Sequence, residues 1–78
     1  MRFRWIRNSS RTGCISAIVT RSLLKNMDLE IALDMSLPNY AMNPESLSKL
    51  ERKSVLKEAS DSLRRIEETR RSGSSASG

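Results

Sequence analysis

The chain has 78 residues and a net charge of +5 at pH 7, from 14 lysines and arginines against nine aspartates and glutamates. A chain of this length forms one domain at most, and its only aromatic residues, Phe3, Trp5 and Tyr40, offer little material for a self-sufficient core. It has no histidine and a single cysteine, Cys14, which excludes zinc fingers, histidine-based zinc centres and an internal disulfide.

The first 27 residues form a basic segment that contains arginine and lysine but no acid. Its arginine-rich and serine/threonine-rich composition resembles that of a mitochondrial or plastid transit peptide. Cations that alternate with large apolar residues are also typical of surfaces that contact nucleic acid or anionic lipid. The residues that would make such contacts are Arg2, Phe3, Arg4, Trp5, Arg7 and Arg11. A disordered arm, or noncoding sequence ahead of Met27, is the remaining interpretation.

The end of the basic segment has the spacing of a helical face. Ile15, Ile18, Val19, Ser22 and Leu23 follow each other at intervals of three, one, three and one residues. The β-branched residues in this stretch favour a strand instead. We predict a short helix over about residues 14–26. No apolar run approaches the roughly 20 residues of a membrane-spanning helix, so we expect no transmembrane span.

Residues 28–43 form an acidic and apolar segment that ends in a turn. Apolar residues occupy every second position from Leu29 to Leu37, which is the pattern of a strand. The leucine, alanine, methionine and glutamate of the same stretch favour a helix. Pattern and composition therefore disagree, and an extended conformation over 29–37 stays one of two alternatives. Pro38 is expected to close the segment in a turn.

Residues 44–71 are predicted to form one long amphipathic helix. Asn43 is a favourable N-cap, and Pro44 suits the first helical position because its missing N–H would have no partner there. At the other end, Arg70 and Arg71 suit the negative end of the helix dipole. Gly73 can adopt the left-handed conformation that often follows a helix.

The apolar seam of this helix covers only its second half. Leu56, Ala59, Leu63 and Ile66 are spaced as in a coiled coil of two heptads, and Val55 lies beside them. Two heptads are too few for a stand-alone coiled coil. Burying Leu56, Leu63 and Ile66 contributes roughly 5–9 kcal/mol, which is small beside the backbone entropy of ordering the whole helix. The helix therefore needs a covering surface, either another chain or segments 14–37.

The whole sequence predicts a mainly α-helical protein with disordered termini. Its segments are 1–27, a basic arm or transit peptide; 28–43, an acidic and apolar segment; 44–71, the long helix; and 72–78, a disordered serine/glycine tail.

The sequence contains no pattern typical of catalysis. Without histidine, neither Cys14 nor the carboxylates have an evident base or dyad partner, and the glycines form no phosphate loop. We therefore expect no enzymatic activity, no metal and no cofactor. We predict a small intracellular interaction module that binds another protein, or a second copy of itself, through Val55, Leu56, Ala59, Leu63 and Ile66. The alternative is a basic nucleic-acid-binding peptide that uses residues 2–11. A mitochondrial or plastid location follows from the transit-peptide interpretation, and a nuclear or cytoplasmic one from the others.

Overall fold

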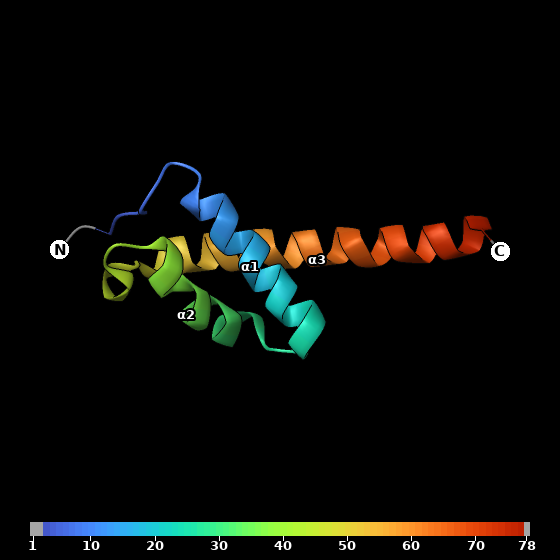
Figure 1. Cartoon of the computed structure of the whole chain (residues 1–78), viewed down its shortest axis with the longest axis horizontal. Helices are drawn as coiled ribbons and strands as arrows, with labels where there is room; N and C mark the ends of the chain where they lie inside the picture. The colour runs from blue at the N-terminus through green and yellow to red at the C-terminus, as the bar shows by residue number, and fades with distance from the viewer. Residues whose placement is uncertain (1–2, 78) are drawn as a thin grey trace.

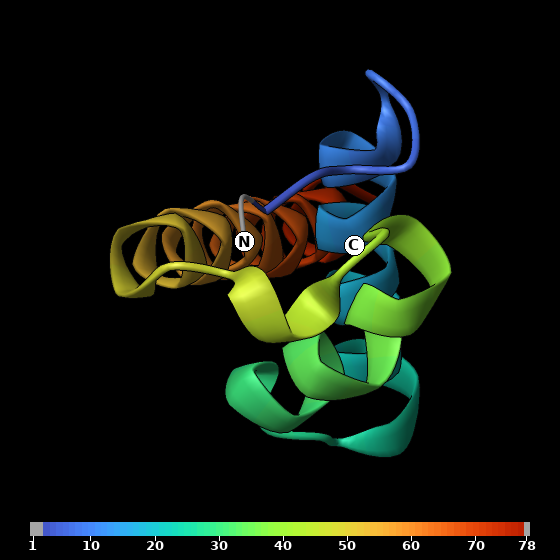
Figure 2. The ribbon, with the colours of Figure 1, turned by 90° about the vertical axis from the view of Figure 1, so that its left-hand side faces the viewer.

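The computed structural model describes the backbone of residues 3–77 and the side chains of residues 3–71. Its elements are α1 (Ser10–Lys25), α2 (Leu29–Tyr40), the short 3-10 helix η1 (Pro44–Ser46) and α3 (Lys49–Ser77). α1 and α2 run antiparallel, and α3 passes behind both and extends beyond them (Figure 1). Figure 2 looks along α3 and shows α1 and α2 together on one side of it. The described residues are mainly helical, as predicted.

The predicted helix over 14–26 is confirmed as α1, which begins one turn earlier than expected. The Ser10 hydroxyl accepts a hydrogen bond from the Arg7 N–H at 2.8 Å, which ties down the first turn. The helix ends at Lys25 and is followed by the C-cap Asn26, whose left-handed backbone (φ 51°, ψ 43°) is a common stop signal. Gly13 allows a close approach: a Cβ atom there would lie 2.9 Å from Cε1 of Tyr40.

The extended conformation considered for 29–37 is wrong, because these residues belong to α2. Helix propensity prevails over the period-two pattern, since a helix buries a continuous face against α1. That face consists of Ala32, Leu33, Ser36 and Leu37. The helix leaves two other apolar side chains in contact with water, because Ile31 is 52% and Met35 is 49% exposed. The turn predicted at Pro38 is also wrong, because this proline lies inside α2, which ends at Tyr40.

The single helix predicted over 44–71 is wrong at its beginning. Asn43 and Pro44 open η1, and the extended backbone of Leu47 then separates η1 from α3. This break lets Leu47 pack against the core. α3 receives its own cap from Ser48, whose hydroxyl accepts a hydrogen bond from the Glu51 N–H at 3.1 Å. Serine followed by glutamate three residues later is the capping-box signature of a helix start.

The helix end predicted at Arg71, with Gly73 after it, is also wrong, because the backbone of α3 continues to Ser77. The side chains of residues 72–77 and the whole of Gly78 lie outside the described residues. The same is true of Met1 and Arg2. The disordered serine/glycine tail over 72–78 therefore stays a prediction.

The core lies where the helices meet, and its buried apolar residues come from α1, from α2 with its C-cap, and from α3. They are Cys14, Ile18, Val19, Ala32, Leu33, Leu37, Ala41, Val55 and Ala59. The apolar stripe of α3 is thus covered by the chain's own segments, which is one of the two coverings that the sequence allowed. Among the described residues, no helix has the length and apolar content of a bilayer crossing.

Candidate functional site

The predicted partner-binding seam of α3 lies largely within the chain's own core. Val55 and Ala59 are fully buried, so neither is accessible to a second molecule without unfolding. Leu56, Leu63 and Ile66 are half-buried and pack against the same core. Only the outer parts of these three side chains are therefore available for contact with a partner.

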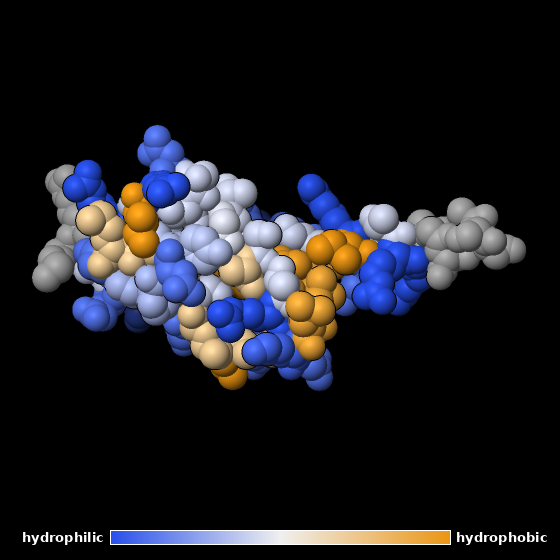
Figure 3. Space-filling model, viewed as in Figure 1, coloured by the Kyte–Doolittle hydropathy of each residue, from blue (hydrophilic) through white to orange (hydrophobic). Residues whose placement is uncertain are grey.

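An apolar groove lies where α3 leaves the cover of α1. It has a volume of about 470 Å³. The α1 wall includes Ile15, Val19 and Leu23, which follow each other at intervals of four residues and so form one ridge of the helix. Ile66 faces them from α3, with Arg65 beside it. The remaining lining residues are Thr12, Ser16, Thr20 and Ser62. Figure 3 shows hydrophobic side chains gathered at the junction of α1 and α3.

The groove residues of α1 were not predicted as site residues, although the sequence carries a signal for them. The apolar arc of α1 is wider than a single contact requires. Ile18 is fully buried in the core, whereas Leu23, on the adjacent ridge, keeps 38% of its surface exposed. Such a double arc is a sequence pattern that marks a helix with two apolar neighbours.

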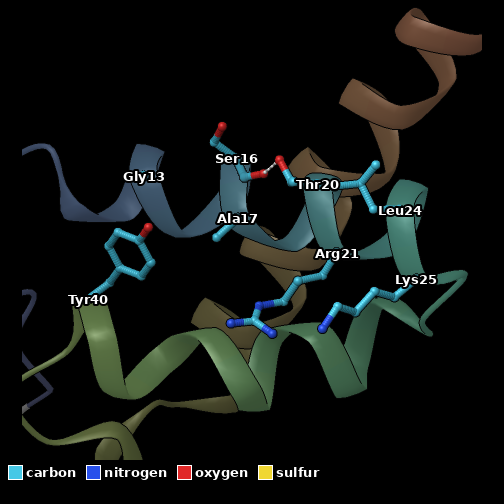
Figure 4. Close-up of a pocket in the computed structure, with 8 residues that line it drawn as sticks. All are labelled: Gly13, Ser16, Ala17, Thr20, Arg21, Leu24, Lys25 and Tyr40. Carbon is cyan, nitrogen blue, oxygen red and sulfur yellow. Dashed lines mark hydrogen bonds between the residues drawn. The ribbon is translucent and has the colours of Figure 1, made fainter.

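A second hollow, of about 530 Å³, lies between α1 and α2 (Figure 4). Arg21 and Lys25, one helical turn apart, extend toward α2, and Tyr40 lies at the far end. Among the described residues no carboxylate lines this hollow, and neither cation forms an ion pair. Leu24, also on its wall, is 79% exposed. The hollow therefore combines positive charge with an open, solvated surface.

Arg11, one of the predicted nucleic-acid contacts, is instead engaged within the chain. Its guanidinium forms ion pairs with Glu51, at 3.1 Å, and with Glu58, and donates a hydrogen bond to Ser54 Oγ at 2.7 Å. Partial burial lowers the pKa of Arg11, but the bonds to Glu51 and Glu58 outweigh this and raise it overall. These acids and Ser54 lie on consecutive turns of α3, so Arg11 fastens the start of α1 to α3.

The other predicted contacts of the N-terminal arm divide into an inner and an outer set. Trp5 forms an isolated antiparallel bridge with Ala41, and its ring meets that of Phe3 edge to face at a centroid distance of 4.8 Å. Both rings pack against the core. Arg4 and Arg7 are exposed, and Arg2 lies outside the described residues. The structure thus brings the arginines to the surface and turns the aromatic rings inward.

Cys14, considered as a nucleophile from the sequence, has no exposed surface. Burial raises the pKa of its thiol from 9.0 to about 11. The thiol is therefore neutral at physiological pH, and a neutral, buried thiol is a poor nucleophile.

We expect Cys14 to react with a thiol reagent such as DTNB only when the chain unfolds. At about pH 8 the folded chain should react at least about a hundredfold more slowly than the chain unfolded in urea. Rapid labelling of the folded chain would contradict the buried placement.

The raised pKa of Cys14 also makes stability depend on pH. Because the folded pKa exceeds the unfolded one, the contribution of Cys14 to the free energy of unfolding is complete below about pH 9 and is lost as pH rises to about 11. Urea titrations of the native chain and of Cys14→Ala across this range test the effect.

Within the described residues, no three histidine, cysteine, aspartate or glutamate side chains gather so as to hold a metal ion. Comparison of the chain with models of known protein families, with curated proteins and with solved structures finds no match.

Proposed function

We propose that this chain is a small protein-interaction module that binds an apolar-faced helix of another protein in the groove between α1 and α3. The observation that carries the proposal is the apolar lining of this groove, with Ile15, Val19 and Leu23 on one wall and Ile66 on the other. A groove between two helices is a common receptor for an amphipathic helix, which inserts side chains spaced by three and four residues.

The energetics favour a reversible contact. Leu23 is partly exposed, and Ile15 and Ile66 are half-buried. Covering what remains of these side chains contributes roughly 1 kcal/mol each, because full burial of a large aliphatic side chain is worth about 1.5–3 kcal/mol. A helix that fills the groove would also cover the methyl group of Thr20 and the stem of Arg65, both of which line it.

The occupant is more readily another protein than a second copy of this chain. α1 and α3 turn their principal apolar faces into the core, and α2 leaves only the short pair Ile31 and Met35 exposed. Beyond Ile66, residues 67–71 of α3 are polar and exposed, so they carry no apolar ridge that could enter the groove of a second molecule. α1 has no acidic residue and Arg65 is the charged residue of the groove lining. An apolar helix with acidic residues at its flank is therefore the complementary partner.

Photocrosslinking from the wall of the groove tests this proposal. A photoreactive amino acid replaces Arg65, and a control variant carries it at Ser60, which is also exposed and lies about 140° around α3. We expect adducts with another protein from position 65 and not from position 60. Adducts between two copies of the chain, or equal adducts from both positions, would overturn the proposed occupant.

Binding of the crosslinked segment, prepared as a peptide, provides the quantitative test. Leu23→Asp places a charge in the groove, and we expect it to weaken binding about tenfold or more. Leu24→Asp is the matched control, because Leu24 is the adjacent leucine but lines the hollow on the α2 side. Equal effects of the two substitutions would place the binding site outside the groove.

A further inference from the structure

We infer that one end of the bundle is a docking surface for an anionic lipid bilayer. This end is formed by residues 3–9, which precede α1 and are called the arm from here on, and by the connection after α2. The residues of this surface are Arg4, Ile6, Arg7 and Met42, and we call it the arm surface. They line one hollow of the molecule together with Phe3, Trp5 and Asn8. The arm lies across the end of the molecule that faces the viewer in Figure 2.

Backbone pairing holds the arm surface in place. The Ile6 N–H donates to the Tyr40 carbonyl and the Met42 N–H donates to the Arg4 carbonyl, each at 2.9 Å. Successive side chains alternate across such a pair. Trp5 and Ala41 therefore point into the core, while Arg4, Ile6 and Met42 share the outer face. The arrangement is preorganised, so binding need not order a flexible arm first.

The outer face combines exposed aliphatic groups with exposed cations. Ile6 is 47% and Met42 is 65% exposed, although both are large apolar side chains. Within the described residues, the guanidinium groups of Arg4 and Arg7 form no ion pair, and the lining of this hollow contains no acid. Anionic headgroups attract such arginines, and aliphatic side chains gain free energy by entering the boundary between headgroups and acyl chains.

The same observations favour lipid over nucleic acid. A single-stranded base binds by stacking on the face of an aromatic ring. Phe3 and Trp5 pack against each other and against the core, so they are engaged within the chain. The apolar groups that reach the surface are aliphatic, and they provide no stacking platform. Arg11, the third described arginine of the arm region, is already paired with Glu51 and Glu58.

Vesicle binding of the full chain tests the inference. The probes are phosphatidylcholine vesicles and mixed phosphatidylcholine–phosphatidylserine vesicles, with co-sedimentation of the chain as the readout. We expect binding to the anionic vesicles only, weakened by added salt. Absence of binding to anionic vesicles, or equal binding to both kinds, would overturn the inference. So would salt-sensitive binding of a single-stranded oligonucleotide without binding of vesicles.

Paired substitutions separate the two parts of the surface. We expect Arg4→Gln with Arg7→Gln, and likewise Ile6→Ser with Met42→Ser, to weaken vesicle binding about tenfold. The matched control is Arg64→Gln with Leu50→Ser, an exposed cation and an exposed leucine on α3. If the control weakens binding as strongly, or if the Ile6 and Met42 substitutions have no effect, the inferred insertion is wrong. Circular dichroism of each variant checks whether the fold is retained.

Discussion

Aspartate in place of Val55 is expected to unfold the bundle. Val55 has no exposed surface and packs in the core where α3 meets the other helices. A carboxylate there would be buried without a partner, which costs about 3–5 kcal/mol. In a chain of this size a single core rarely supplies more than about 3–5 kcal/mol of stability, so the cost is comparable with the whole. We therefore expect the variant to lose the cooperative urea transition of the native chain, as monitored by circular dichroism.

Leu50→Asp is the matched control for this substitution. Leu50 lies on the same helix but is 81% exposed, so the new carboxylate stays in water. We expect a change within about 0.5 kcal/mol. If Val55→Asp were tolerated equally well, Val55 would face solvent, and the seam would be free for another molecule as the sequence first indicated.

Removal of residues 1–27 is expected to destroy the cooperative fold. α1 supplies Cys14, Ile18 and Val19 to the core, and the truncated chain would expose the faces of α2 and α3 that now pack against them. α2 has 12 residues, and isolated helices of this length are marginal in water. We expect the fragment 28–78 to lose most α2 helicity and to unfold without a sigmoidal transition.

Adding a peptide of residues 1–27 back to the fragment provides the control. Recovery of helicity in a mixture would show that the loss comes from the missing packing surface and not from aggregation. A fragment 28–78 that unfolds cooperatively by itself would contradict the three-helix core. The outcome also bears on the predicted transit peptide, because a mature protein cleaved near Met27 would have to fold without α1.

The positions of α1 and of most of α3 could be predicted because their apolar residues recur at helical spacing. In α1, Ile18 and Val19 mark the buried side directly. The start of α3 could also have been found, since Ser48 and Glu51 have the spacing of a capping box. Asn43 and Pro44 looked like the stronger signal, but a favourable first turn does not ensure that the helix continues. Burial of Leu47 decides where the chain straightens.

The conformation of 29–37 could not be decided from local pattern. Strict alternation in this stretch fits a strand, yet a strand needs a neighbouring strand for its backbone hydrogen bonds. Within residues 3–77 no other segment forms a strand. The helix satisfies its own backbone bonds and buries Leu33 and Leu37 against α1, at the cost of exposing Ile31 and Met35.

The candidate site was predictable only in part, because it depends on which helix covers which face. Ile66 was identified from its spacing and does line the groove. Ala59 has the same spacing and Val55 lies beside it, but both are buried in the core, a difference that arises from the tertiary arrangement. Arg11 lies in a basic, acid-free segment and was therefore predicted to contact phosphate. Its acidic partners, Glu51 and Glu58, lie 40 and 47 residues further along the chain. Pairings over such separations are not visible in local sequence.

The projection of α3 beyond α1 divides one continuous helix into two units of different cooperativity. We expect the turns around Val55 and Ala59 to exchange their amide hydrogens only when the bundle opens, because these two side chains belong to the core. From Arg64 to Arg71, Ile66 alone is half-buried, so these turns depend on intrinsic helix propensity and can fray independently. A helix seated beside Arg65 and Ile66 would extend the protected unit along α3. Binding in the groove would thus reduce the fraying of α3 between Arg64 and Arg71, on the side of the molecule away from the arm.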